Sequence, residues 1–261
     1  MFIRKIINQK PKPKIIYIFI IFVVVFFCFY FIESNENRQE IMGKYTLEND
    51  GICILFNPEY ATKTIDYPSE KLKEDILQKL PDGYIFLDYI YKIENSSLST
   101  FHRDVTSSKH IYRTKYPVYT VILYMYSGEL LSFCPGSNFT YPFVWSRIRN
   151  ISGETGTVFL FDCDILHAGC DNECRIKREV LQYKLCHKDD LNKLKELSGI
   201  NVVKKEIECK TTIWNRAMRK ASYFVEMPIN TFLYPLMIKR EKNDNLIGKI
   251  QEFIPIAFYN N

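Results

Sequence analysis

The stretch "YPVYTVILYMY", residues 116–126, decides the fold class of this chain. It is free of charge and rich in β-branched and aromatic residues, which favour strands over helices. Three other stretches are also short and rich in β-branched, aliphatic and aromatic residues: "YIFLDYIYKI" at 84–93, "TVFLFDCDI" at 157–165 and "REVLQYKLC" at 178–186. Turn-forming residues stand between them, in "SGE", "CPGS" and "SGETG". No long helical stripe interrupts 84–187, so the sequence predicts a mainly β protein, an antiparallel sandwich or jelly roll.

A helix is expected before these strands. "SEKLKEDILQKL", residues 69–80, places Leu72, Ile76 and Leu80 four residues apart, which is the spacing of a helical stripe. The following "PDG" ends it.

The pattern becomes helical again beyond the last strand. "KDDLNKLKEL" at 188–197 is amphipathic, and "TTIWNRAMRKASYFVEM" at 211–227 begins with threonines that can cap a helix. We therefore expect flanking helices, including a C-terminal helical extension that packs on the sheet.

Composition and charge limit the classes of partner. Hydrophobic residues make up 47% of the 261 residues, enough for a sizeable core. The formal net charge is +5, but five of the 35 basic residues precede residue 15. The rest of the chain is nearly neutral and lacks the basic surface that a nucleic-acid backbone requires. Nucleic acid is therefore not an expected partner.

The five early basic residues precede an apolar run. Ile15 to Ile32, "IIYIFIIFVVVFFCFYFI", is 18 residues long and has no charge. As a helix it approaches the roughly 30 Å thickness of a hydrocarbon core. The run is longer than a usual signal-peptide core and lacks small residues for cleavage, so an uncleaved anchor is the preferred interpretation. The basic flank predicts a single-pass type II membrane protein with residues 34–261 lumenal or extracellular.

The expected organisation has five parts: a basic cytosolic tail (1–14), a transmembrane anchor (15–32), a stalk (33–45), a β domain with an N-terminal helix (46–187) and the C-terminal extension (188–261). Three glycosylation tripeptides, at Asn95, Asn138 and Asn150, agree with translocation and predict a glycoprotein. Cys170 and Cys174 are spaced for a local disulfide; as zinc ligands they lack a CxxC partner pair.

Two motifs carry the candidate chemistry. "FHRDVTSSKH" at 101–110 contains His102 and Asp104, and "FLFDCDILHAG" ends an apolar run with His167. Residues i and i+2 of a strand point to the same face, so the imidazole and the carboxylate of the first motif can approach one metal ion together. Two histidines and one carboxylate with open positions form the facial triad of non-haem Fe(II) oxygenases. Each motif alone is more often structural, and the joint pattern favours a metal site.

Together, "FHRDVTSS", "GTVFLFDCDILHAGCDN" and "RIKREVLQYKL" resemble the Fe(II)- and 2-oxoglutarate-dependent dioxygenases, particularly the phytanoyl-CoA dioxygenase-like branch. The resemblance covers about 84–187. It implies a double-stranded β-helix in which His102, Asp104 and His167 bind iron. It also implies that Arg178 holds the distal carboxylate of 2-oxoglutarate, for which a guanidinium fork is suited. Arg175 is the competing residue.

The activity implied by this resemblance is hydroxylation by dioxygen, coupled to oxidative decarboxylation of 2-oxoglutarate to succinate and carbon dioxide. The organic substrate stays open between a protein side chain, a glycan and a lipid. Two alternatives remain: a non-catalytic jelly-roll module anchored in a membrane, and a cupin-like metalloenzyme that does not use 2-oxoglutarate.

Other polar residues near the motifs have less definite roles. Packing is the preferred role, ahead of cosubstrate binding, for three strand residues: Tyr119, Thr120 and Tyr124. Asp162 and Asp164 are spaced as a carboxylate pair, but their place before "ILHAG" favours a turn. His110 and His187 have no partner in the sequence that indicates metal binding.

Overall fold

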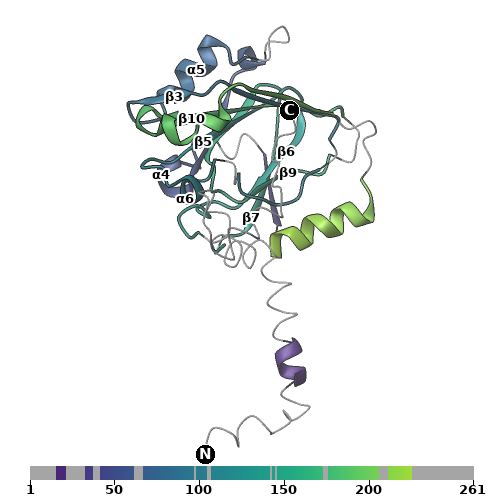
Figure 1. Ribbon diagram of the computed structural model, residues 1–261. Helices are drawn as coiled ribbons and strands as arrows, with labels where there is room; N and C mark the ends of the chain where they lie inside the picture. Colours follow the sequence, from purple (N-terminus) through teal and green to yellow (C-terminus); the bar gives the residue numbers. More distant parts are fainter. Residues whose placement is uncertain are drawn as a thin grey trace, which may run out of the picture.

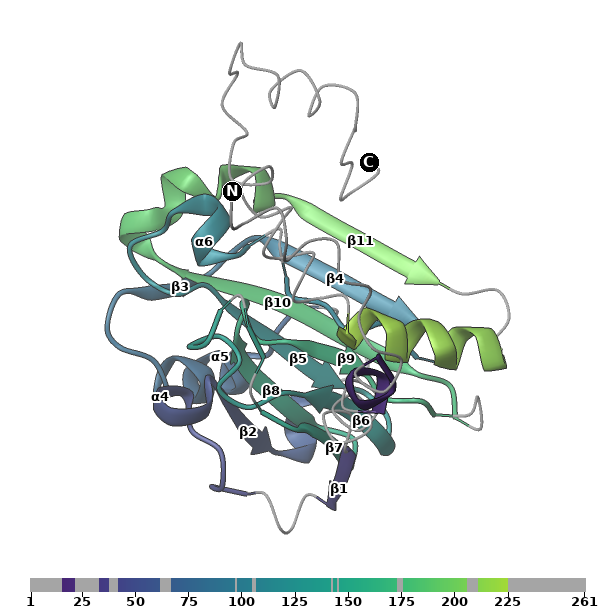
Figure 2. The ribbon, with the colours of Figure 1, turned by 90° about the horizontal axis from the view of Figure 1, so that it is seen from below.

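Strands contain more of the described residues than helices do, as the sequence predicts. The computed structural model describes residues 16–21, 33–37, 42–61, 67–96, 98–104, 107–141, 143–144, 146–172, 176–205 and 211–224. The strands are arranged in two mixed sheets, as in a jelly roll (Figures 1 and 2). The protein is therefore mainly β with a few short helices.

The smaller sheet has four strands in the order β1-β7-β6-β9. Their bounds are Glu33–Asn37, Ile148–Gly153, Gly128–Phe133 and His167–Gly169. β6 pairs antiparallel with both β7 and β9, whereas β1 pairs parallel with β7. The candidate ligand His167 thus begins a strand of this sheet.

The larger sheet has seven strands, in the order β11-β4-β10-β5-β8-β2, with β3 also paired to β10. Its strands have these bounds: β2 Ile52–Phe56, β3 Tyr84–Phe86, β4 Tyr89–Glu94, β5 Tyr119–Tyr124, β8 Thr157–Asp162, β10 Glu179–His187 and β11 Ile200–Lys205. The four apolar stretches read from the sequence provide β3, β4, β5, β8 and β10, and antiparallel pairs join the central ones.

Strand β5 shows why these stretches are apolar on both faces. Ile122 and Tyr124 belong to the core between the two sheets, which also contains Leu131 and Phe133 of β6. The alternate residues of β5 face a second core on the other side of the larger sheet. Both faces of the strand are covered, and a strand in that position reads as a continuous apolar run.

The helix expected over 69–80 covers that second face. It is α5, Glu70–Leu77, and the Ser69 side chain caps it by accepting from the Leu72 backbone amide. Leu72 and Ile76 are buried against the larger sheet, as their spacing indicates. The other short helical segments are α4, α6, η1, η2 and η3, at Leu47–Asp50, Lys109–Tyr112, Pro58–Tyr60, Lys188–Lys193 and Lys195–Leu197.

The predicted stalk contains a strand. β1 is the polar sequence "ESNEN", which has no apolar alternation to indicate its pairing. It is held at the edge of the smaller sheet by side-chain hydrogen bonds: Arg149 donates to Ser34 and Glu36, and Asn150 donates to Glu33 and Asn35. A strand of polar residues leaves no hydrophobic signal in the sequence.

In the described part of the C-terminal extension, 188–205 and 211–224, a strand accompanies the helical segments; 206–210 and 225–261 lie outside the described residues. "KDDLNKLKEL" forms η2 and η3, and β11 follows and adds to the larger sheet in parallel with β4. Asp190 breaks the amphipathic pattern because it is buried and accepts from the Lys115 and Tyr116 backbone amides, each at 2.9 Å. A helix at 213–224 does form, capped by Thr212 as the sequence suggests.

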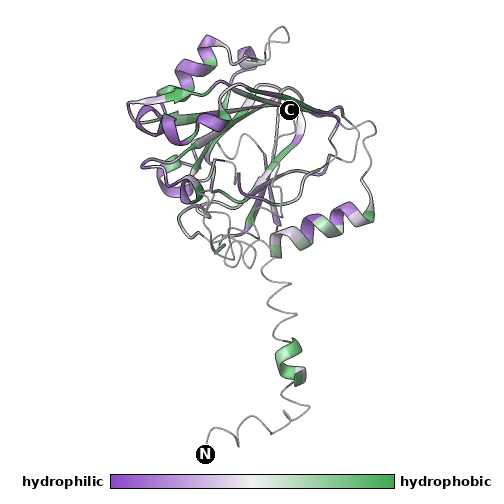
Figure 3. Ribbon diagram, in the orientation of Figure 1, coloured by the Kyte–Doolittle hydropathy of each residue, from purple (hydrophilic) through white to green (hydrophobic). Residues whose placement is uncertain are grey.

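The predicted localisation is contradicted. In the part of the chain that the structure describes, no helix is both long and apolar enough to cross a membrane. Of the predicted anchor, the structure describes 16–21, a short helix of hydrophobic residues (Figure 3). The remainder of 15–32 and the predicted tail lie outside the described residues.

Glycosylation of Asn138 and a Cys170–Cys174 disulfide are two further predictions that depend on a lumenal location. Asn138 is buried and its side-chain amide donates to Asp162, so it is not placed as a glycosylation acceptor. Cys170 is a free, buried thiol, and Cys174 lies outside the described residues.

Candidate metal centre

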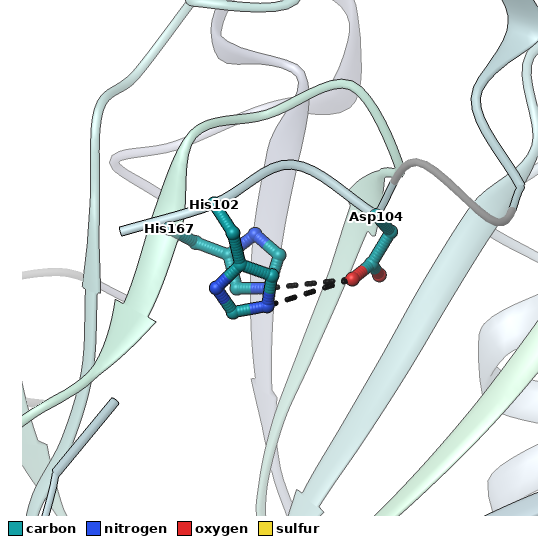
Figure 4. Close-up of side chains that lie close together, drawn as sticks. All are labelled: His102, Asp104 and His167. Atoms are coloured by element: carbon teal, nitrogen blue, oxygen red, sulfur yellow. Dashed lines mark ion pairs between the residues drawn. The ribbon is translucent and has the colours of Figure 1, made fainter. Parts of the chain in front are cut away.

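Three side chains from two distant parts of the sequence meet at one point (Figure 4). One ligand atom each from His102, Asp104 and His167 lies within 4.8 Å of the other two. His102 and His167 form an antiparallel bridge, with backbone N–H···O distances of 2.9 and 3.0 Å. The backbone amide of Asp104 donates to the carbonyl of Cys163 at 2.9 Å. Backbone hydrogen bonds therefore join His102 to the start of β9 and Asp104 to the β8–β9 connection.

Each imidazole is oriented by the backbone carbonyl of the residue two positions before it. Nδ1 of His102 lies 2.8 Å from the Thr100 carbonyl oxygen, and Nδ1 of His167 lies 3.0 Å from the Ile165 carbonyl oxygen. Because a carbonyl only accepts, both Nδ1 atoms carry the hydrogen, and both Nε2 atoms present a lone pair. These Nε2 atoms each lie 3.8 Å from the same oxygen, Oδ1 of Asp104. Such backbone partners are typical of metal-binding histidines.

The two histidines differ in exposure. The side chain of His102 is 47% exposed, whereas that of His167 is 4% exposed. Burial, and then the neighbouring His102, lower the pKa of His167 to about 4. His167 is therefore neutral at physiological pH, the form in which an imidazole binds a metal.

The carboxylate of Asp104 uses its two oxygens differently. Oδ1 faces the imidazoles, while Oδ2 accepts hydrogen bonds from Thr120 Oγ1 at 2.6 Å, Lys184 Nζ at 2.6 Å and Gln182 Nε2 at 3.3 Å. Burial alone would raise the pKa of this carboxyl, but the Lys184 ammonium holds it below its usual range. Asp104 is ionised, with one oxygen available to a metal ion.

Lys184 was not singled out by the sequence, although the signal exists. It lies two residues after Gln182 on β10, so both side chains project from the same face of the strand. A lysine between Tyr183 and Leu185 in a central strand is the available signal, because a strand with both faces covered requires a partner for any charge. Lys184 is fully buried.

Arg178 is also buried, just before β10. Its Nε donates to the Tyr126 hydroxyl at 3.0 Å, and its Nη2 donates to the Cys170 carbonyl. A Cβ at Gly169 would lie 2.5 Å from Nη1, so the guanidinium occupies space that any other residue there would fill. A guanidinium has five N–H donors, so several remain for a ligand. The competing Arg175 lies outside the described residues.

One cavity joins these groups. It has a volume of about 250 Å³ and is lined by Arg178 as well as by the three clustered residues. Tyrosine and aliphatic side chains form much of the remaining wall, including Tyr89, Tyr91, Tyr124, Ile122 and Val180. A mostly apolar cavity with a few convergent polar groups is the usual form of a small-molecule site.

The three strand residues of uncertain role now separate. Thr120 donates to Asp104, so it supports the cluster. Tyr124 lines the cavity, with its hydroxyl donating to the Leu130 carbonyl at 3.0 Å. Tyr119 packs edge-on against Tyr84 at 5.3 Å, in the core on the other face of the larger sheet.

Asp162 and Asp164 stabilise the turn that precedes His167. The Asp164 backbone amide donates to Asp162 Oδ1 at 2.9 Å, and the Asp164 carboxylate accepts from Ser108 Oγ and from the Lys109 amide. Burial raises the pKa of each to about 6, helped by repulsion from Asp164 at Asp162 and by repulsion from Asp104 at Asp164. This agrees with the turn role that the sequence favours.

The other two histidines have structural partners away from the cluster. His110 stacks on Tyr141 with ring centroids 4.2 Å apart. His187 accepts from the Asp189 backbone amide at 3.2 Å and caps η2. Neither lines the cavity.

Comparison with known proteins gives likenesses among solved structures alone. No protein-family model matches the chain, and no curated protein matches it. EvdMO1 matches at 12% identity and TM-score 0.38, over 46% of this chain but only 31% of that one. SnoN, a non-haem α-ketoglutarate-dependent epimerase from nogalamycin biosynthesis, matches at 11% identity and TM-score 0.38, over 57% of this chain and 82% of that one. HygX from Streptomyces hygroscopicus matches at 11% identity and TM-score 0.42, over 59% and 88%.

Proposed function

We propose that this chain is an Fe(II)- and 2-oxoglutarate-dependent oxygenase that hydroxylates an organic substrate. The observation that carries the proposal is the cavity shared by His102, Asp104, His167 and Arg178. A three-ligand metal cluster alone fits many metalloenzymes. A buried arginine in the same cavity adds the partner that a dicarboxylate cosubstrate needs.

The donor set fits Fe(II). Two imidazole Nε2 atoms and one carboxylate oxygen converge, and Nδ1 hydrogen bonds hold both rings in the metal-binding tautomer. This is the facial arrangement that leaves positions open for ligands. In the role proposed here, His102, Asp104 and His167 hold the iron, which supplies the activation of dioxygen when bound.

Arg178 fits the distal carboxylate of 2-oxoglutarate. Its position is fixed by donation to Tyr126 and Cys170, so little side-chain freedom is lost on binding. A guanidinium can meet a carboxylate through two parallel hydrogen bonds. The role of Arg178 is to orient the cosubstrate along the cavity, with its other end toward the three ligands.

The chain further controls access of water and substrate. Ile122, Tyr124 and Val180 form an apolar wall of the cavity, which limits water near the reacting groups. His102 is the exposed member of the cluster, so the substrate approaches from its side. The two sheets around this cavity correspond, in our proposal, to a double-stranded β-helix.

Succinate formation tests the activity without knowledge of the substrate. The purified protein, supplied with Fe(II), 2-oxoglutarate and dioxygen, is expected to release succinate slowly in the absence of substrate. His102→Ala is the matched variant, because the residue is half exposed and its loss leaves the core intact. Equal succinate release by the wild type and this variant would contradict the proposal.

A further inference from the structure

We propose that Lys184 sets the charge of the metal site, and that it weakens binding of the bare metal ion while strengthening binding of an anionic cosubstrate to the loaded site. This inference rests on the proposed function and extends it to a residue that does not touch the metal. Lys184 is thus a positioning and charge-setting residue.

The first step is the contact between Lys184 and Asp104. Nζ lies 2.6 Å from Oδ2, the oxygen that does not face the imidazoles. The side chain of Lys184 is 1% exposed and that of Asp104 is 9% exposed, so solvent hardly screens the pair. Ser107 Oγ and Thr120 Oγ1 lie 2.9 and 2.7 Å from the same Nζ. These contacts fix the ammonium beside the carboxylate.

The second step is the charge of the donor set. A facial triad of two neutral imidazoles and one carboxylate carries one negative charge, which attracts a divalent cation. Here the Lys184 ammonium offsets that charge at the ligand itself. The loaded site is therefore more positive, by one unit, than the same three ligands would be without the lysine.

The third step concerns the ligands of this site. The cation is repelled by Lys184, and a dianion such as 2-oxoglutarate is attracted to it, both through a buried and weakly screened environment. Removal of the lysine charge must then change the two affinities in opposite directions. A lysine that served only to hold Asp104 in place would not do this, because its loss would weaken metal binding and cosubstrate binding together.

Replacement of Lys184 by a neutral residue provides the test. Lys184→Met keeps much of the length of the side chain without its charge. We expect it to bind Fe(II) alone about tenfold more tightly than the wild type, and 2-oxoglutarate on the iron-loaded protein several-fold more weakly, both in anaerobic titrations. If Lys184→Met does not fold, Lys184→Gln makes the same test, since its amide can still donate to Asp104.

Thr120→Val is the matched control. It removes a neutral hydroxyl that donates to the same Asp104 oxygen and accepts from Lys184 Nζ, and it leaves both charges in place. We expect any effect of this variant to have the same sign for Fe(II) and for 2-oxoglutarate.

The outcomes distinguish this inference from the proposed function. Opposite changes in Lys184→Met support the charge-setting role, whereas parallel changes or no change overturn it and leave the proposed function standing. If the wild type binds Fe(II) but no 2-oxoglutarate, the proposed cosubstrate is wrong, and azide becomes the probe anion. Weaker azide binding in Lys184→Met then supports the role of Lys184, and unchanged binding overturns it. A wild type that takes up no Fe(II) overturns both.

Discussion

The buried carboxyl of Asp104 and those of Asp162 and Asp164 lie close to the same residue, Cys163, but their pKa values are shifted in opposite directions. Asp104 pairs with the backbone of Cys163, and Asp162 and Asp164 flank that same cysteine. The Lys184 ammonium, 2.6 Å from Asp104, opposes the effect of burial and holds the pKa of this carboxyl low. Burial instead raises the pKa of Asp162 and of Asp164 to about 6. A cation in direct contact with the carboxylate, more than burial, decides which carboxylate stays ionised and can serve a metal.

The largest expected effect comes from Asp104 itself. Asp104→Asn is expected to abolish Fe(II) uptake and to lower the free energy of unfolding by about 3–5 kcal/mol, because Lys184 is left as an unpaired buried charge. Iron content and denaturant unfolding measure the two losses. Adding Lys184→Met should restore much of the stability without restoring iron. A double variant no more stable than Asp104→Asn would contradict the charge argument.

Arg178 is expected to have the next largest effect. Arg178→Ala should weaken 2-oxoglutarate binding by about ten- to a hundredfold, the worth of charge-assisted hydrogen bonds of roughly 1.5–3 kcal/mol, while Fe(II) binding is retained. Arg178→Lys should recover part of the loss, since it keeps the charge but not the planar fork. Isothermal titration of the iron-loaded protein gives these affinities.

Arg175→Ala is the control for Arg178, and we expect it to change little. If Arg175→Ala greatly weakens 2-oxoglutarate binding and Arg178→Ala leaves it unchanged, Arg175 and not Arg178 binds the cosubstrate. No effect in either variant would mean that 2-oxoglutarate is not the cosubstrate.

The smallest expected effect is a pH dependence of the free energy of unfolding that comes from Asp162 and Asp164 and not from Asp104. The two carboxyls have a pKa of about 6 in the folded protein, above the usual value of about 4 for an aspartate, so the folded state binds more protons between these pH values. Their contribution to the free energy of unfolding therefore falls as the pH rises from about 4 to 6. Asp162→Asn removes part of this penalty.

We expect Asp162→Asn to gain stability relative to the wild type by about 1 kcal/mol more at pH 7.5 than at pH 4.5. Thermal unfolding at both pH values measures the difference. An equal effect at the two pH values would show that Asp162 does not titrate in this range.

The sequence predicted what depends on local pattern. Apolar, β-branched runs mark β5 and β8 because both faces of these strands are covered. The three clustered residues were found from two short motifs, since the chemistry of a metal site limits the residue types that can form it. The helix at 69–80 followed from the spacing of Leu72 and Ile76.

What the sequence missed depends on contacts between distant residues. β1 is polar throughout and pairs in parallel with β7, with additional side-chain hydrogen bonds such as that from Arg149 to Glu36, so no hydrophobic pattern marks it. Strand β11 lies at the sheet edge and is largely exposed. The role of Lys184 depends on its contact with Asp104, 80 residues earlier in the chain, which strand periodicity does not reveal.

Anaerobic titration of Fe(II), and then of 2-oxoglutarate, into the purified protein tests the central claim most directly. The proposed site predicts uptake of one iron per chain, followed by a weak visible absorption band that appears only when 2-oxoglutarate is added. Asp104→Asn should show neither, and Arg178→Ala should take up iron but need far more 2-oxoglutarate to give the band. Iron uptake without a band would contradict the proposed cosubstrate, and the absence of iron uptake by the wild type would contradict the metal centre itself.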